Sequence, residues 1–362
     1  MKVVVCGTRG FPNIQGGIET HCEGLYPKIA KHGVDVIVVR RSAYVESSVT
    51  YPGIKFKDIN VPKIIGIESA LHTLLGVFYA KKIKADIVHI HAIGPSIVVP
   101  VAKMLGLKVV ITHQGPDYDR EKWGKFAKFI IKTGERFAAR YADDIIVVSS
   151  VISDILKNKY KRTKNVHIIY NGVKDFEIIH STNYITSLGA VPQKYILAVG
   201  RFVEEKNFDK LIDVYIKLKK QLSCQLVIAG DADIETAYSR KLKEKAKLNG
   251  VILAGMVKNE KLAELFSHAA LFVLPSSHEG LPLSLLEAMC YKRKVVISDI
   301  PANLSVNLEK ESYFRLDDLN DLFDKILYQL NLDSIEKEYD ISMYNWENIA
   351  IETIRVYEGK TI

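Results

Sequence analysis

The sequence predicts an α/β protein with two doubly wound domains that face each other across a cleft. Short apolar runs alternate along the 362 residues with segments of helical periodicity, which is the pattern of parallel strands joined by helices. The alternating segments form two sets, which meet near residues 170–173 and a polar stretch around 180–189. The length also fits about two domains of ordinary size. We therefore expect one domain over residues 1–178 and a second over residues 179–344.

Ten continuous apolar runs are the expected strands, since strands buried on both faces lack polar alternation. The first domain contains Val3–Gly7, Val34–Val39, Ile87–His91, Val109–Thr112 and Ile145–Ser149. The second contains Tyr195–Gly200, Gln225–Ala229, Val251–Ala254, Leu271–Leu274 and Lys294–Ser298. Sheets of this kind bind ligands at the carboxyl ends of their strands. The loops after these runs are therefore the places to search for a site.

The composition narrows the kind of protein. Hydrophobic residues make up 48% of the chain, an ordinary value for a globular protein. The four cysteines are scattered, which favours reduced thiols over a disulfide framework or a zinc site, and no cofactor is expected. No apolar run approaches the roughly 18 residues of a membrane-spanning helix. Since a strand follows Met1 directly, we expect no signal peptide and a cytoplasmic protein.

Two glutamates, Glu279 and Glu287, lie on either side of a Gly/Pro turn. The run Leu271–Leu274 before them is an expected strand, and the pattern after Pro282 is helical. Glu279 should therefore lie on the loop at the strand's carboxyl end, and Glu287 in the following helix. Because a helix N-terminus attracts anions, the pair suits a ligand with both hydroxyls and phosphates, such as a nucleotide sugar. The alternative is a strand–loop–helix unit with solvated glutamates.

Two other loops provide groups that suit phosphates. Arg201 and Lys206 follow an expected strand and could clamp a diphosphate; the alternative is a surface salt bridge to Glu204 or Glu205. Gly16-Gly17 precedes a helix, where backbone N–H groups can approach a phosphate. The glycine loop matches neither Gly-x-Gly-x-x-Gly nor the Walker A sequence, which disfavours nicotinamide and NTPase functions.

A histidine and an Asp-x-Asp sequence also follow strands. His113 comes directly after Val109–Thr112. A lone histidine is more often structural than catalytic, but the position beside the expected site raises the odds of a role there. Asp231 and Asp233 follow Gln225–Ala229. No further ligands accompany them, so we interpret them as a turn rather than a metal site. We therefore expect metal-independent chemistry.

The net charge of +8 is concentrated in one segment, residues 120–140. Lysines and arginines alternate there with aromatic residues, and Trp123, Phe126, Ile130 and Phe137 share a face of the helical wheel. Such a helix can lie on an anionic membrane surface. An ordinary helix packed on the core, with solvated lysines, is the alternative. A nucleic-acid partner is not expected, because no nucleic-acid-binding module is recognisable.

The motifs together resemble those of retaining family 4 glycosyltransferases with the GT-B fold, over nearly the whole chain. Glu279 to Glu287 matches the Glu-x7-Glu motif of that family, and Gly16-Gly17, Gly200-Arg201 and Tyr170-Asn171-Gly172-Val173 match its other signatures. The N-terminal half resembles a narrower group, the rhamnosyltransferases of bacterial surface-polysaccharide assembly. The matching stretches are Gly7-Thr8-Arg9-Gly10, Gly16-Gly17-Ile18-Glu19-Thr20, Lys122-Trp123-Gly124-Lys125 and Gly134-Glu135-Arg136. Because His113-Gln114-Gly115-Pro116-Asp117-Tyr118 departs from that group's pattern, no particular sugar is assigned.

The resemblance implies a role for each matching position. Glu287 would bind the ribose, Glu279 the donor sugar, and Arg201 and Lys206 the departing diphosphate. The other implied donor contacts are Gly16, Gly17, Met256, Val257, Gly280, Leu281, Pro282 and Leu283, with His113 near the anomeric carbon. A helix around Asn345–Tyr357 would cross back to the first domain, which thereby gains residues 345–362.

The resemblance also implies a reaction. Attack would occur on the face from which the phosphate leaves, with a phosphate oxygen taking the acceptor's proton and no carboxylate nucleophile. The donor would carry UDP, GDP or dTDP. The acceptor would be a glycan or a lipid-linked glycan, the lipid being polyprenyl diphosphate at the cytoplasmic face of the membrane. Two alternatives remain open, namely a nucleotide-sugar epimerase of the same fold and a non-catalytic glycan-binding subunit.

Overall fold

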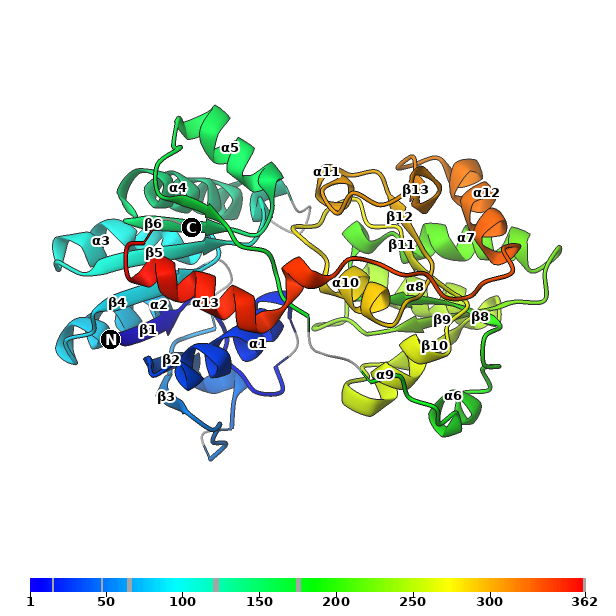
Figure 1. Ribbon diagram of the computed structural model, residues 1–362, viewed down its shortest axis with the longest axis horizontal. Helices are drawn as coiled ribbons and strands as arrows, with labels where there is room; N and C mark the ends of the chain where they lie inside the picture. Colours follow the sequence, from blue (N-terminus) through cyan, green and yellow to red (C-terminus); the bar gives the residue numbers. More distant parts are fainter. Residues whose placement is uncertain (15, 47, 64–66, 120–123, 174–176, 361–362) are drawn as a thin grey trace. The chain divides into compact units, whose positions relative to one another are not determined.

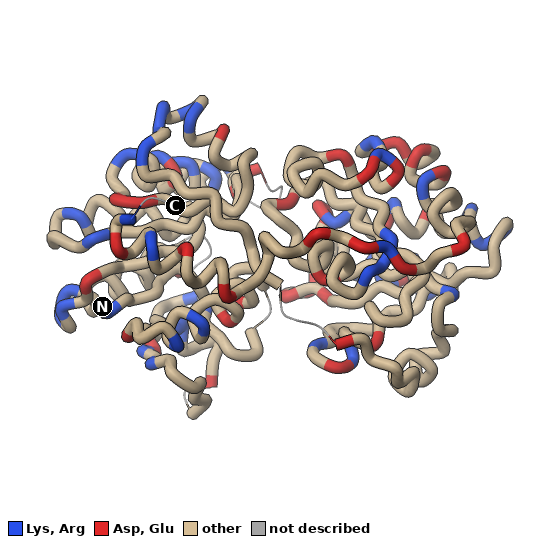
Figure 2. Tube along the Cα trace, in the orientation of Figure 1, with Lys and Arg blue, Asp and Glu red and all other residues tan. Residues whose placement is uncertain are grey.

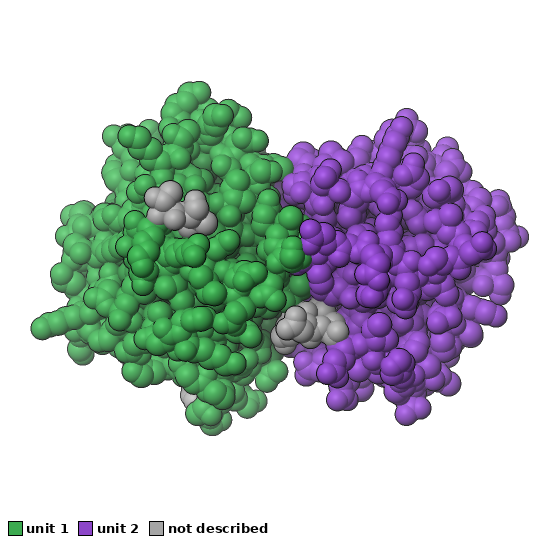
Figure 3. Space-filling view, in the orientation of Figure 1, with its two compact units in different colours: residues 1–173, 342–362 green, residues 174–341 purple. Residues whose placement is uncertain are grey.

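The computed structural model describes residues 1–14, 16–46, 48–63, 67–119, 124–173 and 177–360. The chain divides into two compact units, shown in different colours in Figure 3. Unit 1 comprises Met1–Val173 and Ser342–Ile362, and unit 2 comprises Lys174–Ile341. From the sequence, we expected the divisions at 178/179 and 344/345. No helix in the described ranges is both long and apolar enough to cross a membrane.

Unit 1 contains a parallel sheet with the strand order β3-β2-β1-β4-β5-β6-β7 (Figure 1). Its strands are β1 (Lys2–Cys6), β2 (Asp35–Arg41), β3 (Ile54–Ile59), β4 (Ile87–His91), β5 (Lys108–His113), β6 (Asp144–Val147) and β7 (Val166–Ile168). The five strands expected here from apolar runs are present. The outer strands β3 and β7 were not predicted, because β3 alternates apolar with charged residues and β7 has only three residues.

Helices connect the strands of unit 1 and bury their apolar faces against the sheet. They are α1 (Gly17–Lys31), α2 (Glu68–Lys82), α3 (Val99–Met104), α4 (Lys125–Tyr141), α5 (Ser150–Tyr160) and α13 (Trp346–Tyr357). Short 3-10 helices occur at η1 (Ser42–Tyr44), η2 (Pro95–Val98), η3 (Asp117–Asp119) and η6 (Ser342–Tyr344). Parallel strands require such crossovers, so helical connections follow from the all-parallel pairing.

The C-terminal helix α13 packs beside α1 in unit 1 (Figure 1). Its N-cap is Asn345, whose side-chain oxygen accepts the backbone N–H groups of the first turn. Trp346 lies between two glycines, because a Cβ atom on either Gly24 or Gly172 would come within 2.3 Å of its indole ring. The 170–173 junction therefore contains glycine because the indole occupies the space of a side chain.

Three buried histidines lie beneath α13, and we call His21, His89 and His91 the histidine cluster. The rings of His89 and His91 stack with centroids 4.5 Å apart, and the Tyr26 hydroxyl lies 3.0 Å from His89 Nδ1 and 2.5 Å from His91 Nε2. The Tyr357 hydroxyl of α13 lies 2.6 Å from His89 Nδ1. The histidine cluster thus joins β4 to both α1 and α13.

Unit 2 contains a parallel sheet with the strand order β10-β9-β8-β11-β12-β13. Its strands are β8 (Tyr195–Val199), β9 (Gln225–Ala229), β10 (Ile252–Gly255), β11 (Leu271–Leu274), β12 (Val295–Ser298) and β13 (Tyr313–Phe314). The five strands predicted for this half are present, with ends shifted by a residue or two. The edge strand β13 was not predicted, since two residues carry no periodic pattern.

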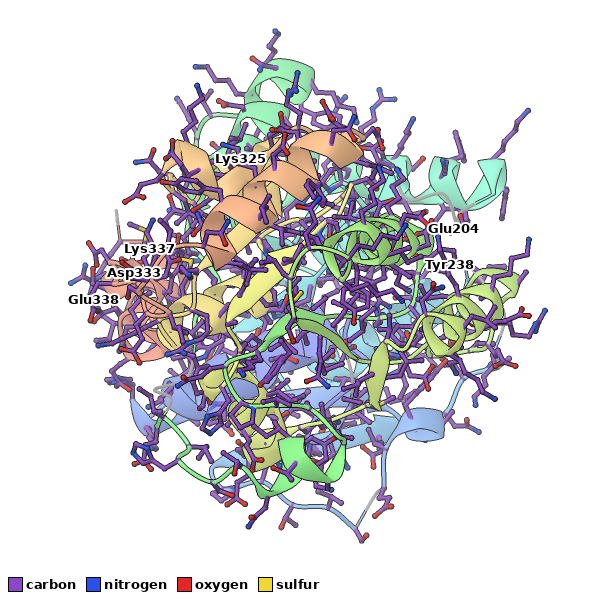
Figure 4. All side chains as sticks on the ribbon, turned by 90° about the vertical axis from the view of Figure 1, so that its right-hand side faces the viewer. Glu204, Tyr238, Lys325, Asp333, Lys337 and Glu338 are labelled. Carbon is purple, nitrogen blue, oxygen red and sulfur yellow. The ribbon has the colours of Figure 1, made fainter. Side chains whose placement is uncertain are left out.

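Seven helices are described in unit 2, and two 3-10 helices accompany them. They are α6 (Asn183–Ser187), α7 (Phe208–Leu218), α8 (Ala237–Leu248), α9 (Asn259–Ser267), α10 (Leu283–Cys290), α11 (Pro301–Leu304), α12 (Leu319–Leu330), η4 (Glu204–Lys206) and η5 (Lys310–Ser312). After α12 the chain is held by exposed ion pairs, of Lys337 with Glu309 and of Glu338 with Lys292. Figure 4 labels Lys337 and Glu338 in this segment. Such exposed pairs contribute little to stability.

Both sheets have the doubly wound topology, with a point where the strand order reverses. In unit 1 this switch point lies between β1 and β4, and in unit 2 between β8 and β11. Strand order therefore points to the loops after these four strands as the ligand-binding edges.

Candidate functional site

The loops after β8 and β11 in unit 2 are tied together at the switch point. The backbone N–H of Ser277 donates to the Glu205 carbonyl at 2.9 Å, and the Asn207 amide donates to the Pro275 carbonyl at 2.9 Å. Asn207 is buried, and its φ of 50° lies in the left-handed region that asparagine tolerates better than most residues. These bonds fix the relative positions of the side chains on the two loops.

Lys206 and Glu279 meet across these two loops. The Lys206 ammonium lies 2.5 Å from Glu279 Oε1, and the two side chains are 14% and 13% exposed. The pair joins residues 73 positions apart in the sequence. The ion pair is partly desolvated and lies at the sheet edge formed by the loops after β8 and β11. A polar ligand bound at that edge would contact the ammonium and the carboxylate.

Two glycines allow the backbone to approach closely beside this pair. A Cβ atom on Gly230 would lie 1.9 Å from the Gly200 carbonyl oxygen, and the φ of Gly230 is +135°. A Cβ atom on Gly200 would lie 3.2 Å from Lys206 Cε. The lysine side chain therefore crosses over Gly200, and the ends of β8 and β9 converge without intervening side chains.

Arg201 takes a partner that the sequence did not predict. Its guanidinium lies 3.1 Å from Asp233 Oδ2, whereas the expected salt-bridge partners were Glu204 or Glu205. Asp231 lies 2.8 Å from the Lys243 ammonium and accepts the N–H of Ala232. The Asp-x-Asp sequence thus forms a turn whose carboxylates contact basic side chains. The described residues contain no group of three His, Cys, Asp or Glu side chains arranged to hold a metal.

The helix α10 carries the second glutamate of the motif. It begins at Leu283 after Pro282, where a helical pattern was expected, and its apolar side buries Leu285, Leu286 and Met289. Glu287 is half-buried one turn into the helix. Gly280 is half-buried and Leu281 is buried in the preceding turn. At the end of β10, Met256 is 52% exposed and Val257 is half-buried.

The corresponding loop of unit 1, after β1, is held by hydrogen bonds to the Glu19 carboxylate. Glu19 Oε1 accepts hydrogen bonds from the Arg9 backbone N–H at 3.0 Å and from the Thr8 hydroxyl at 3.3 Å. The φ of Gly16 is +147°, which other residues rarely adopt, and a Cβ atom there would lie 2.1 Å from Glu19 Oε2. Gly17 begins α1 and has open space around it. The glycine pair thus lies at the start of a helix, as predicted, whereas the hydrogen bonds between Arg9 and Glu19 were not predicted.

His113 ends β5, but its ring is not presented to solvent. It is 1% exposed, its Nε2 lies 3.1 Å from Glu135 Oε1, and its Nδ1 accepts the Gly115 N–H at 3.2 Å. Both ring nitrogens are therefore engaged within unit 1. The expectation that the ring lines a sugar pocket needs correction to this extent, because the strand-end position of a histidine does not reveal a buried carboxylate on a distant helix.

The basic helix α4 differs from its predicted packing. Its buried residues are Ile131, Gly134, Glu135, Ala138 and Ala139. Phe126 of the expected aromatic face is 69% exposed, Ile130 and Phe137 of that face are half-buried, and Phe129 outside it is 67% exposed. Figure 2 shows lysine and arginine positions along α4 and α5. Arg120, Lys122 and Trp123 lie outside the described residues.

The side of α4 that packs on unit 1 is a different side from the aromatic face of the helical wheel, and most of its residues are small. A Cβ atom on Gly134 would lie 2.0 Å from the Ile93 carbonyl, so small residues let α4 approach the loop after β4. Small residues on a helix face, such as Gly134, Ala138 and Ala139, were the signal that could have identified it.

Two family models match the chain in succession. The Glycosyltransferase Family 4 model matches residues 15–188, and the Glycosyl transferases group 1 model matches residues 183–339. The chain is a family 4-like glycosyltransferase. Its two doubly wound units are those of the GT-B fold, which confirms the fold class expected from the sequence.

Several relatives of this glycosyltransferase cover much of its length. An uncharacterized glycosyltransferase of Methanocaldococcus jannaschii is 23% identical over 99% of this chain and 98% of its own. The capsular polysaccharide biosynthesis glycosyltransferase CapH of Staphylococcus aureus is 28% identical over 66% of each chain. The amylovoran biosynthesis glycosyltransferase AmsD of Erwinia amylovora is 26% identical over 59% of each chain.

Solved structures show the same fold at low sequence identity. A sucrose-phosphate synthase from Thermosynechococcus elongatus has a TM-score of 0.83 and 18% identity, covering 99% of this chain and 98% of that one. Anabaena HepE in complex with UDP-glucose has a TM-score of 0.75 and 15% identity, with the same coverage. The glycosyltransferase therefore shares its architecture with proteins from which its sequence has diverged widely.

Proposed function

We propose that this glycosyltransferase is a retaining, metal-independent enzyme that transfers a sugar from a nucleoside diphosphate sugar to a glycan acceptor. The observation that carries the proposal is the Lys206–Glu279 pair at the switch point of unit 2. A cation suits a diphosphate and a carboxylate suits sugar hydroxyls, so the pair offers one group to each half of such a donor. UDP-glucose is the ligand named for the HepE complex, which supports this class of donor.

The proposal gives each loop of unit 2 a task. Lys206 and Arg201 would neutralise the charge that develops on the departing diphosphate, in place of a metal ion. Glu287 would accept hydrogen bonds from the ribose, and Glu279 from the transferred sugar. The backbone of 280–283 would face the sugar and the phosphates, and Met256 and Val257 would lie near the base. In unit 1, Gly16 and Gly17 would approach the distal phosphate, and the loop that begins at His113 would lie on the sugar side.

The same pair supports retention without an enzyme nucleophile. A carboxylate bound at 2.5 Å by an ammonium has its charge partly neutralised, which weakens it as a nucleophile. Two-carboxylate hydrolysis would also require a second group flanking the sugar bond, whereas Glu287 is assigned to ribose. We therefore place the attack on the face from which the phosphate departs. A phosphate oxygen would take the proton of the acceptor hydroxyl.

The acceptor is proposed from the relatives and from the charge of unit 1. AmsD and CapH are named for amylovoran and capsular polysaccharide biosynthesis, which supports a growing surface glycan as the acceptor class. The exposed Phe126 and Phe129 and the lysines of α4 support a lipid-linked glycan at an anionic membrane surface. A polyprenyl diphosphate anchor at the cytoplasmic face of the membrane would provide negative charge for the lysines of α4.

A panel of donors tests the reaction. The purified protein is incubated with UDP-, GDP- and dTDP-sugars, with and without a polyprenyl-diphosphate-linked glycan, and nucleoside diphosphate release is measured. We expect acceptor-dependent release from one donor and a product whose anomeric configuration, measured by NMR, equals that of the donor. An epimerised donor without transfer would support the epimerase alternative. Binding without turnover on any donor would support the non-catalytic alternative.

Membrane binding of α4 has its own test. Changing Phe126 and Phe129 to serine, or Lys125 and Lys128 to glutamate, should reduce binding to vesicles containing 30% anionic lipid by at least tenfold, because each lysine near such a surface contributes on the order of 1 kcal/mol. Vesicle co-sedimentation measures the effect. Transfer to a water-soluble acceptor should remain unchanged.

A matched charge control is available in unit 2. Lys241 and Lys247 are exposed on α8, which carries no exposed aromatic residue among those described. Their change to glutamate alters the net charge by the same amount and should leave vesicle binding within twofold of the wild type. If the α4 and α8 variants lose vesicle binding equally, the attraction comes from net charge, and the assignment of α4 fails.

A further inference from the structure

Glu135 is a fully buried carboxylate on the packed face of α4, and it connects four elements of unit 1. We call it and its four side-chain partners the Glu135 cluster. The partners are His113 at the end of β5, Tyr118 in η3, and Lys159 and Tyr160 at the end of α5. The loop between His113 and Tyr118 follows β5 at the ligand-binding edge of the sheet, so the cluster holds that loop from behind.

Each oxygen of Glu135 receives two hydrogen bonds. His113 Nε2 donates to Oε1 at 3.1 Å and the Tyr118 hydroxyl at 3.2 Å. The Lys159 ammonium donates to Oε2 at 2.6 Å and the Tyr160 hydroxyl at 2.5 Å. Burial alone would raise the pKa of Glu135, but the bonds from His113, Lys159 and Tyr160 outweigh burial and lower that pKa to about 2. The carboxylate is therefore an anion with every lone-pair direction used.

The cluster also determines the tautomer of His113. Its Nδ1 accepts the Gly115 N–H at 3.2 Å, so the ring proton is on Nε2 and is donated to Glu135. A glutamine at position 135 would accept on one oxygen only. Its amide N–H group would then oppose either the Lys159 ammonium or the His113 N–H. Only a carboxylate satisfies all four donors.

We propose that Glu135 is a positioning residue for sugar transfer, holding His113 as the neutral Nε2–H tautomer and, through His113 and Tyr118, fixing the loop after β5 against α4 and α5. The inference rests on the proposed function, because the loop matters only if this edge of unit 1 takes part in transfer. It assigns His113 a structural task within the site. The imidazole does not act as a proton carrier, since neither of its nitrogens is available to a substrate.

A matched control lies at the opposite edge of the same sheet. Asp144, at the start of β6, is also buried and also has one histidine and one lysine partner. His167 Nε2 lies 3.0 Å from its Oδ1, and the Lys108 ammonium lies 3.5 Å from its Oδ2. This edge carries the amino ends of the strands, away from the ligand-binding loops. Asp144→Asn therefore removes a similar pair without touching the loop after β5.

The test compares Glu135→Gln with Asp144→Asn in the full-length protein. For Glu135→Gln we expect kcat for sugar transfer to fall at least tenfold, with the affinity for the free nucleoside diphosphate within twofold of wild type, since unit 2 provides the nucleotide contacts. Asp144→Asn should keep kcat within twofold. NMR of protein labelled with 15N-histidine, with His113 assigned from a His113→Gln sample, should show the Nε2–H tautomer in the wild type and its loss in Glu135→Gln.

If Glu135→Gln does not fold, Tyr160→Phe removes one of the four donors and should lower kcat about threefold with the tautomer unchanged. Equal losses of kcat in the Glu135 and Asp144 variants would overturn the proposal, as would an unchanged kcat in Glu135→Gln or an Nδ1–H tautomer in the wild type. A wild-type protein that transfers no sugar would instead overturn the proposed function, whereas an active wild type with these results would remove only the role of Glu135.

Discussion

Replacing Lys206 by alanine is expected to lower kcat for sugar transfer by roughly 100- to 1,000-fold, the range found when one preorganised donor to a developing charge is removed. The Lys206 side chain crosses over Gly200 at the switch point of unit 2, where its ammonium would meet a departing diphosphate. Its loss also leaves the half-buried Glu279 without this cation, so the negative charge of the carboxylate would repel the phosphates of the donor. Initial rates at saturating donor measure the effect.

Lys210 provides the control for this substitution. It lies on α7 of the same unit, and its ammonium is also 2.5 Å from a carboxylate, that of Asp317. This pair is more exposed, at 37% and 68%, and does not belong to the loops after β8 and β11. Lys210→Ala should keep kcat within twofold. The assignment of Lys206 fails if Lys206→Ala retains more than one tenth of the wild-type kcat, or if both variants lose activity equally.

Unit 1 is expected to lose stability steeply between pH 7 and pH 5, because the histidine cluster folds only in its neutral form. Burial lowers the pKa of His21 to about 4 and that of His89 to about 3, and it holds the pKa of His91 well below the ordinary value. Unfolded histidines titrate near 6.5. Their stabilising contribution is therefore complete above about pH 6.5 and declines as the pH falls toward the folded values.

The size of this effect follows from the same shifts. At pH 5 each histidine that stays neutral when folded costs roughly 2 kcal/mol relative to pH 7, since one pKa unit corresponds to about 1.4 kcal/mol. Three such residues approach the total stability of a typical domain, about 5–15 kcal/mol. His72 on α2, with a pKa lowered to about 4 by burial, adds to the slope. The other titratable side chains at the cluster, Tyr26 and Tyr357, have raised pKa values and stay neutral throughout.

Trp346 allows the transition to be measured. It is 5% exposed in α13 and packs against His21 with ring centroids 5.4 Å apart. In a Trp123→Phe background its fluorescence reports urea unfolding of unit 1 at each pH. His89→Gln should lower stability at pH 7 but flatten the pH dependence, whereas His268→Gln, a half-buried residue of unit 2, should leave the slope unchanged. An identical slope in His89→Gln would refute the role of the cluster.

Much of the fold could be predicted from the sequence because parallel strands leave a local signal. Runs such as Leu271–Leu274 and Gln225–Ala229 are buried on both faces, so every residue in them is apolar or nearly so. The positions of Lys206 and Glu279 at strand ends follow from those runs. The strands β3, β7 and β13 left no comparable signal, because they lie at sheet edges or are too short for a pattern.

The partners of the charged residues could not be predicted in the same way. For Arg201 the alternative to a diphosphate clamp was a salt bridge to Glu204 or Glu205, but its partner in the structure is Asp233, 32 residues away. His113 was expected in the site because it follows a strand, but its ring is hydrogen-bonded to the Glu135 carboxylate on α4. A sequence pattern reports how strongly each segment is buried, whereas a partner is chosen by which segments pack together.

The alternation of strands and helices and the two doubly wound units could thus be predicted from the amino-acid sequence. The same is true of the loops that carry the Lys206 and Glu279 side chains. Three contacts could be seen only in the folded chain. The Lys206 and Glu279 side chains form an ion pair, and the His113 ring is hydrogen-bonded to the Glu135 carboxylate. Trp346 fills the space beside Gly24 and Gly172. The physical reason is that burial follows from local composition, whereas close packing and hydrogen-bond geometry join residues that are distant along the chain.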